Sequence, residues 1–312
     1  MIIATHSGKF HADDVWAVAV LDLLFPDCSL IRTRDAEQIR NADFAVDVGG
    51  IWDPQTGRFD HHQKGFEGAR ESGVVYASAG LVWKEHGARC VMTVARASTG
   101  HELSLSDAQD IAYAIDNDLV QYLDMSDTGA AKSAPGGYGL SAIISGFNPN
   151  WLDEQRARNA ADADQLRMNQ FRRAMEFVTD ILVNGVKYRV SAMLAVNQVR
   201  QSELLEGGKL LFLKNSALPW ASVVRREMPE VQFVISHSIT EGRYMLHTVP
   251  AAADTFEARK DLPAAWAGLR DEGLASVTGV ADAIFCHNNL FIAAAVSYEG
   301  VLKMARLALE ES

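Results

Sequence analysis

The chain has 312 residues, of which 48% are hydrophobic and 22% charged, a composition typical of a globular protein with a buried core. It carries 29 Lys and Arg against 40 Asp and Glu, and residues 1–150 alone hold 11 basic against 20 acidic residues. An acidic protein gains no bulk electrostatic attraction to nucleic acid, so a phosphate-bearing substrate would have to be bound locally, by metal ions or a small basic pocket.

Two features of the sequence predict the compartment. No apolar run approaches the ~20 residues of a membrane-spanning helix, and the N-terminal residues lack the basic head, apolar core and cleavage site of a signal peptide. Cys28, Cys90 and Cys286 show no paired spacing, which favours a reducing environment. The sequence therefore predicts a cytoplasmic protein that does not enter a membrane. It leaves the oligomeric state open, a homo-oligomer included.

Strand and helix patterns alternate through the first half of the chain. Short apolar runs predict buried strands, and helical spacing of apolar residues predicts the helices between them. The predicted strands are 1–5, 29–34 and 43–50, and the predicted helices are 13–25, 76–86 and 106–120. A turn is expected at 51–60, and a Gly- and Ser-rich loop with a short helical piece at 127–151. This alternation predicts an α/β domain with a parallel sheet.

The second half has a different pattern. Residues 153–183 are charged and lack Gly and Pro, which predicts one long helix of the kind that bridges two domains. The β-type runs that follow, together with a last helix at 299–309, predict a mixed α+β domain. The predicted strands lie within 188–196, 209–215, 231–238, 244–249 and 283–296.

The residues that could carry chemistry gather in the first 62 positions. His6 follows the first predicted strand, His11 to Asp14 lead into the first helix, and Asp47 lies near the end of the strand at 43–50. The carboxyl ends of parallel strands meet at one edge of a sheet, and the predicted turn leads to Asp60, His61 and His62. The candidates are His6, His11, Asp13, Asp14, Asp47, Asp60, His61 and His62. Each alone has an ordinary explanation, such as a turn histidine or a helix cap. Together at one edge, they predict a metal site.

Imidazole with carboxylate suits Mn²⁺, Mg²⁺ or Zn²⁺. About seven such ligands are too many for one tetrahedral zinc, and they fit two ions that share a bridging carboxylate and a water. Asp116, near the end of a predicted helix, could supply the last carboxylate. Such a pair of ions lowers the pKa of a bridging water and can hold the attacking and leaving oxygens of a phosphoryl group.

At this point the sequence resembles the melanocyte-proliferating-gene-one (Myg-type) family within the DHH phosphoesterase superfamily. The matching stretches are THSGKFHADD (5–14), residues 43–66 with the motif DHH, YASAGLVWKEHG (76–87), AIDNDLV (114–120), GFNPNW (146–151) and residues 262–287. The resemblance implies a catalytic domain at 1–152, a linker helix at 153–183 and a substrate-binding domain at 184–312. It also implies a 3′→5′ exonuclease that acts on RNA or single-stranded nucleic acid, short oligonucleotides included.

The same resemblance implies a role for each site residue. One ion, Mn²⁺ or Mg²⁺, would be held by His6, His11 and Asp47, and the other by Asp13, Asp47, His61 and Asp116. Asp60 would orient His61, and His62 would face the substrate phosphate. Asp47, Asp60 and His62 are thus the predicted catalytic residues.

The C-terminal part departs from the family pattern, because FIAAAVSYEG (291–300) lacks the Gly–Gly–His signature that grips the substrate. Arg259, Lys260 and Arg270 are the expected replacements as phosphate contacts. Trp151, Trp220 and Trp266 could stack on bases, with core packing the alternative. Two other functions stay open: hydrolysis of small phosphate compounds such as pyrophosphate, and a non-catalytic, metal-stabilised regulatory role.

Overall fold

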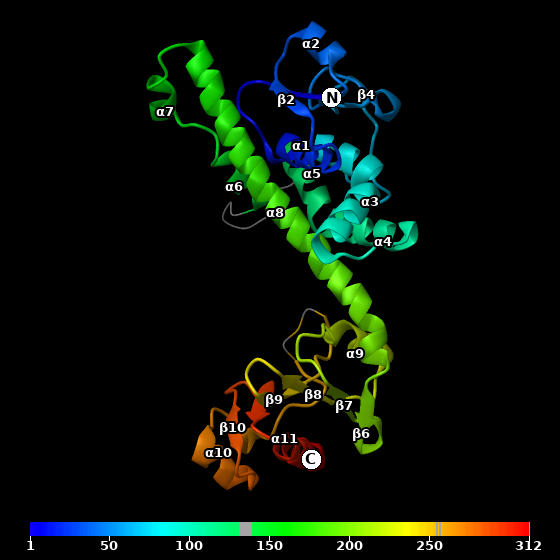
Figure 1. Ribbon diagram of the computed structural model, residues 1–312, viewed down its shortest axis with the longest axis vertical. Helices are drawn as coiled ribbons and strands as arrows, with labels where there is room; N and C mark the ends of the chain where they lie inside the picture. Colours follow the sequence, from blue (N-terminus) through cyan, green and yellow to red (C-terminus); the bar gives the residue numbers. More distant parts are fainter. Residues whose placement is uncertain (131–138, 254, 256, 312) are drawn as a thin grey trace. The chain divides into compact units, whose positions relative to one another are not determined.

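The computed structural model describes residues 1–312 apart from 131–138, 254, 256 and 312. The chain divides into two units, Met1–Val190 and Ser191–Ser312, and each is described by itself (Figure 1). Part of the loop predicted at 127–151 lies outside the described residues. Of the helices in the described ranges, none has both the length and the apolar character needed to cross a bilayer.

A parallel sheet forms the centre of the first unit, as the sequence predicts. Its strands are β1 (Ile2–Thr5), β2 (Ser29–Arg32), β3 (Phe44–Val46), β4 (Trp52–Asp53) and β5 (Arg58–Phe59), in the order β2-β1-β3-β5-β4. Only β4 runs antiparallel, paired with β5 inside the stretch expected to be a turn. The central strands β1 and β3 are apolar without alternation because both faces of a parallel sheet are covered.

Helices pack around this sheet. They are α1 (Ala12–Leu24), α2 (Ala36–Asn41), α3 (Ser78–Thr99), α4 (Leu105–Ile115), the π-helical turn η2 (Asp116–Val120), α5 (Gln121–Asp127), α6 (Leu140–Ser145) and α7 (Trp151–Gln155). Helix α1 is buried along most of its length, and Trp16 on it meets Trp83 of α3 edge to face, with ring centroids 5.8 Å apart. Burial on all sides explains why α1 is almost wholly apolar after its first turn.

The long charged helix begins later and ends later than predicted. Helix α8 runs from Ala160 to Arg200, so the strand expected at 188–196 is wrong. The reason is a stripe of buried residues, Val178, Leu182, Val186 and Val190, that continues at four-residue spacing past Gly185. This stripe outweighs both the glycine and the β-branched residues of the segment. The assignment of catalytic, linker and substrate-binding parts stays a prediction.

The second unit is a mixed sheet with helices, as the sequence predicts. The strands are β6 (Glu203–Leu205), β7 (Leu210–Leu213), β8 (Phe233–Ser238), β9 (Arg243–Thr248), β10 (Ala283–Cys286) and β11 (Ile292–Ala295), in the order β10-β11-β9-β8-β7-β6. The helices are α9 (Ala221–Glu227), α10 (Asp271–Thr278) and α11 (Tyr298–Glu310). Only β7 and β8 pair in parallel. Phe233, Trp266 and Met304 lie in the hydrophobic core of this second unit.

Candidate metal centre

Three parallel strands end at one group of polar side chains. His6 follows β1, Asp47 follows β3, and Asp60 to His62 follow β5. Asp47 has a positive φ of 53°, an uncommon conformation for a residue with a side chain. Its amide donates to the carbonyl of Phe59, 3.0 Å away, which holds the strained residue at the sheet edge. Such strain is often found where a side chain must be aimed at a site.

His6 lies between two carboxylates. Its Nε2 is 3.3 Å from Asp14 Oδ2 and 3.3 Å from Asp47 Oδ2, and its side chain is 5% exposed. Burial opposes a charge on His6, but the hydrogen bonds to Asp14 and Asp47 prevail and raise its pKa to about 10. Burial also opposes the charge on Asp47, yet the three neighbouring imidazoles hold the pKa of this carboxyl well below its ordinary value. Asp47 is therefore an anion in the folded protein.

The adjacent histidines His61 and His62 have different surroundings. His61 is 10% exposed, and its Nε2 lies 3.1 Å from Asp127 Oδ2 and 3.5 Å from Asp47 Oδ1. His62 is 61% exposed, and its Nδ1 lies 2.9 Å from Asp60 Oδ1 and 3.2 Å from Asp47 Oδ1. One imidazole thus faces the buried carboxylates, while the other reaches solvent at the edge of the same group.

Asp60 orients His62 and not His61, contrary to the prediction. Its Oδ1 accepts from the amide of His62 as well as contacting the ring, and its Oδ2 accepts from the amide of Gly50. An aspartate commonly bonds to the backbone two residues further on, which brings its carboxylate over the second histidine of the motif. Asp60 is 2% exposed, so these bonds satisfy a buried charge.

The start of α1 supplies the third part of the group. Asp13 is 1% exposed, and neither of its carboxylate oxygens has a hydrogen-bond partner among the described residues. Burial raises the pKa of Asp13 well above its ordinary value, and the charges of Asp47, Asp127 and Asp14 add to this effect. His11, the N-cap of α1, lies with its Nδ1 3.7 Å from Asp127 Oδ1.

Three sets of these residues could each hold a cation, because in each set the ligand atoms lie within 4.8 Å of one another. The sets are His6, His11 and Asp47; Asp47, His61 and His62; and His11, Asp13 and Asp127. A buried carboxylate without hydrogen bonds, beside other carboxylates, is costly unless a cation accompanies it. The unpartnered oxygens of Asp13 and the mixture of imidazole and carboxylate therefore fit divalent metal ions.

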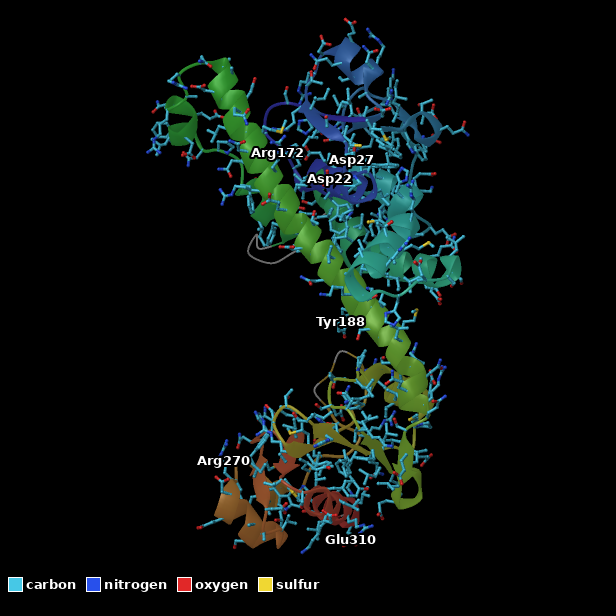
Figure 2. The ribbon with its side chains drawn as sticks, viewed as in Figure 1. Asp22, Asp27, Arg172, Tyr188, Arg270 and Glu310 are labelled. Carbon is cyan, nitrogen blue, oxygen red and sulfur yellow. The ribbon has the colours of Figure 1, made fainter. Side chains whose placement is uncertain are left out.

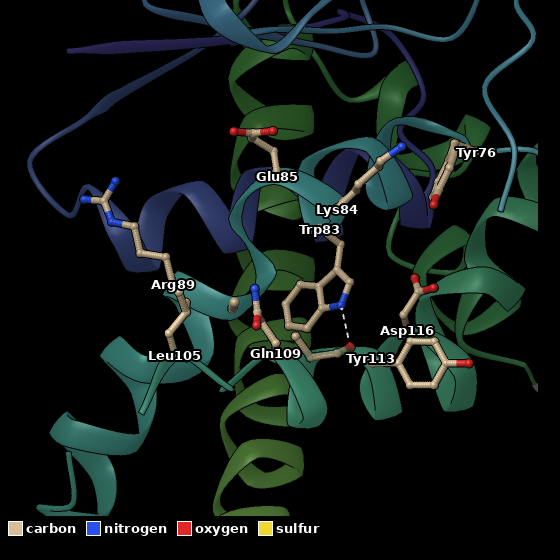
Figure 3. Close-up of a pocket in the computed structure, with 11 residues that line it drawn as sticks. Tyr76, Trp83, Lys84, Glu85, Arg89, Leu105, Gln109, Tyr113 and Asp116 are labelled. Atoms are coloured by element: carbon tan, nitrogen blue, oxygen red, sulfur yellow. Dashed lines mark hydrogen bonds between the residues drawn. The ribbon is translucent and has the colours of Figure 1, made fainter. Parts of the chain in front are cut away.

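Asp116 is not brought to this group. Arg70 binds its carboxylate through two hydrogen bonds of 2.6 Å, and a third nitrogen of Arg70 lies 2.7 Å from Asp124 Oδ2. Asp116 instead lines a cavity of about 410 Å³ together with Trp83 and Tyr113, as Figure 3 shows. Its side chain neutralises an arginine that is nearly buried, so the structure does not bring Asp116 to the other predicted ligands.

Asp127 is the carboxylate that the sequence reasoning missed. It ends α5 and contacts both His61 and His11. An acid in the last turn of a helix opposes the helix dipole, and this unfavourable placement is the signal that could have marked it.

The predicted phosphate contacts of the second unit are mostly engaged elsewhere. Arg259 donates to the carbonyls of Arg225, Met228 and Val231, and Lys260 donates to those of Leu309 and Glu311. Both side chains therefore satisfy carbonyls at or near the ends of helices, and a role of either as a phosphate contact stays a prediction.

Arg270 and the tryptophans differ in exposure. Arg270 is exposed, with its guanidinium over the ring of Phe285, and it stays a candidate (Figure 2). Trp266 is buried in the core, Trp220 is partly buried and Trp151 is 66% exposed. Core packing is thus the role of Trp266, while Trp151 has the exposure that stacking requires.

Comparisons with known proteins agree with these motifs. A family model named MYG1_exonuc, described as an uncharacterised protein family (UPF0160), matches residues 2–309. The chain is 32% identical to the MYG1 protein YER156C of Saccharomyces cerevisiae, over 98% of this chain and 95% of that protein. It is 29% identical to the MYG1 exonuclease of Homo sapiens, over 99% of this chain and 86% of that protein.

Among solved structures, RecJ in complex with Mg²⁺ from Thermus thermophilus aligns with 100% of this chain and 50% of its own, at 11% identity and a TM-score of 0.29. A likeness of that size carries no argument about the site. The match to the family model over nearly the whole chain and the identity to the relatives show the family. The chain therefore belongs to the MYG1 family, as its motifs predict.

Proposed function

We propose that this protein is a divalent-metal-dependent phosphodiester hydrolase, an exonuclease that degrades RNA or other single-stranded nucleic acid in the 3′→5′ direction. The observation that carries the proposal is the place of Asp47, a buried carboxylate common to two of the candidate metal-binding sets. The name exonuclease among the relatives supports the same class of reaction. In this proposal the first unit is catalytic and the second binds substrate.

The residues proposed to hold two ions, Mn²⁺ or Mg²⁺, are His6, His11, Asp13, Asp47, His61 and Asp127. When bound, such ions lower the pKa of water and offset the negative charge of a phosphodiester. Asp47 contributes an anion between imidazoles from different strand ends, so it fixes how far apart those imidazoles lie.

His62 is proposed to contact the substrate phosphate. Its ring is held through Nδ1 by Asp60 and Asp47, while most of the side chain is exposed. The hydrogen bond to Asp47 raises its pKa against the effect of burial, which favours an imidazolium that donates to a phosphate oxygen. Asp60 fixes the orientation of that ring through its contact with Nδ1.

A second candidate keeps the same centre but takes small phosphate compounds as substrates. The 20 acidic against 11 basic residues in 1–150 favour it, because long polymers profit from extended basic surfaces.

A substrate panel separates the two candidates. The metal-depleted protein is reloaded with Mn²⁺ and offered single-stranded RNA labelled at either end, single-stranded DNA, dinucleotides and pyrophosphate. Stepwise release of nucleotides from the 3′ end supports the exonuclease. Turnover of pyrophosphate or dinucleotides alone would replace it with the second candidate, and metal binding without any turnover would favour a non-catalytic role.

A further inference from the structure

Two arginines stand beside the candidate metal centre at the end of a neighbouring strand. Arg32 is the last residue of β2, and Arg34 follows two positions later. Nη2 of Arg32 donates a hydrogen bond to the carbonyl of Gly8, 2.9 Å away. Nη2 of Arg34 lies 3.4 Å from Nδ1 of His6. The loop that carries His6 is therefore flanked by two guanidinium groups.

Arg32 is held in place by aromatic rings. Its guanidinium lies 5.3 Å from the ring centroid of Phe10 and 4.9 Å from that of Phe171. Its Nε is buried and has no hydrogen-bond partner in the described part of the chain. Within that part, no carboxylate oxygen lies within 4.0 Å of the guanidinium of Arg32 or Arg34. Arginines normally pair directly with an anion when they are partly buried, so Arg32 lacks a direct ion pair, and the charges of Asp14 and Asp164 act on it at longer range.

A cavity of about 330 Å³ opens next to these residues. Its lining includes Ser7, Gly8, Arg32, Gln165 and Arg167. Ser7, which lines the cavity, directly follows His6 in the chain, and Arg34 contacts the His6 ring.

The carboxylate of Asp164 also lines this cavity, and its negative charge would repel an anion bound there. It lies 3.0 Å from Arg167, which pairs with Glu154 as well, so those three charges leave one excess negative charge. Arg32, which lines the cavity, offsets that excess, and Arg34 adds a positive charge beside His6. The net attraction for an anion therefore depends on these two arginines.

We propose that Arg32 and Arg34 form an anion subsite for a phosphate group that neighbours the phosphodiester to be cleaved. This inference rests on the proposed function and names the part of the substrate that the first unit recognises. It also gives an acidic protein the small basic pocket that a phosphate-bearing substrate requires. The protein should then prefer a substrate with several phosphates in one strand over an isolated phosphodiester.

The test compares two substrates in the Mn²⁺-loaded, full-length protein. One is a single-stranded RNA of about four nucleotides, and the other is bis(p-nitrophenyl) phosphate, which has one phosphodiester and no neighbouring phosphate. In Arg32→Gln and in Arg34→Gln, we expect the ratio of kcat/KM for RNA to kcat/KM for the small ester to fall by about tenfold or more. Arg172→Gln removes the same charge from an exposed position on α8 and should leave the ratio unchanged (Figure 2).

The outcomes are distinguishable. An equal loss on both substrates would mean that the arginines act on the metal centre or the fold, and an unchanged ratio in both variants would remove the subsite; either result overturns the proposal. If the wild type cleaves neither compound, the proposed function itself fails. Arg34 is exposed, so Arg34→Gln decides the question if thermal melting shows that Arg32→Gln is unfolded.

Discussion

Oδ2 of Asp47 lies 3.3 Å from Nε2 of His6, and both side chains are almost fully buried at the ends of neighbouring parallel strands. Asp47→Asn keeps the shape of the side chain but removes its charge. We expect the variant to lose at least one bound Mn²⁺ and to hydrolyse substrate at least about 100-fold more slowly, since even supporting residues of metal sites cost about 10–100-fold. Metal analysis after gel filtration, together with the RNA assay, measures both effects.

The matched control is Asp27→Asn, which changes an exposed aspartate after α1 (Figure 2). It should bind the same amount of metal as the wild type and keep its activity. Full metal loading in Asp47→Asn would contradict the shared role of Asp47.

Asp127 is expected to hold metal in the place that the sequence suggests for Asp116. Asp127→Asn should weaken Mn²⁺ binding by about tenfold or more, because it removes a carboxylate 3.1 Å from His61. Asp116→Asn should leave Mn²⁺ binding intact and lower the free energy of unfolding by about 1.5–3 kcal/mol, the value of a hydrogen bond to a charged partner such as Arg70. Calorimetric titration and urea unfolding distinguish the two, and the reverse pattern would restore Asp116 as a ligand.

Part of the candidate metal centre could be predicted from the order of the strands along the sequence. The meeting of His6 and Asp47 could be predicted because residues after parallel strands meet at one edge, whatever their separation along the chain, whereas His61 was a candidate through the adjacent histidines that follow Asp60. The pairing of Asp116 with Arg70 could not be predicted, because the two residues are distant in sequence and no pattern marks the pair. The strand expected at 188–196 failed for a related reason, since burial against other elements decides between helix and strand.

Arg70 is predicted to be important for stability. Its removal leaves Asp124, whose side chain is fully buried, without the cation 2.7 Å away. Arg70→Met should lower the free energy of unfolding by about 3–5 kcal/mol, the range for breaking one partner of a buried ion pair. Urea unfolding at neutral pH measures it.

The control for Arg70→Met is Arg96→Met, which breaks an exposed pair with Glu102 and should cost less than about 1 kcal/mol. Equal losses in the two variants would mean that Asp124 does not depend on Arg70.

The pH dependence of metal binding follows from His6 and His61, whose hydrogen-bonded carboxylates prevail over burial and raise each pKa from 6.5 to about 10. In the metal-free protein these charged imidazoles contribute stability that is fully present below pH 6.5 and is lost as the pH rises through about 10. Metal requires neutral imidazole, so Mn²⁺ affinity should rise with pH, by about tenfold per unit for each proton displaced.

Calorimetry at pH 6.5 and 8.5, in buffers of different ionisation enthalpy, measures both the affinity and the protons released. His101→Gln, at an exposed histidine outside the centre, should behave as the wild type. An affinity that does not change with pH would show that neither imidazole is a ligand.

His247 gives the second unit a pH dependence of the opposite sign. Burial beside Trp220, where its Nε2 lies 3.1 Å from Ser236 Oγ, lowers the pKa of His247 from 6.5 to about 4. Between pH 6.5 and 4 the unfolded chain therefore takes up a proton that the folded chain does not. Stability should fall as the pH drops through this window, by at most about 1.4 kcal/mol per pH unit from this residue.

Urea unfolding of the wild type and His247→Gln at pH 7 and pH 5 isolates the contribution of this imidazole, because other titrating groups cancel in the difference. The stability advantage of the wild type over the variant should be smaller at pH 5 than at pH 7. A difference that is the same at both values would mean that the imidazole titrates alike in the folded and unfolded chains, and that burial beside Trp220 does not lower its pKa.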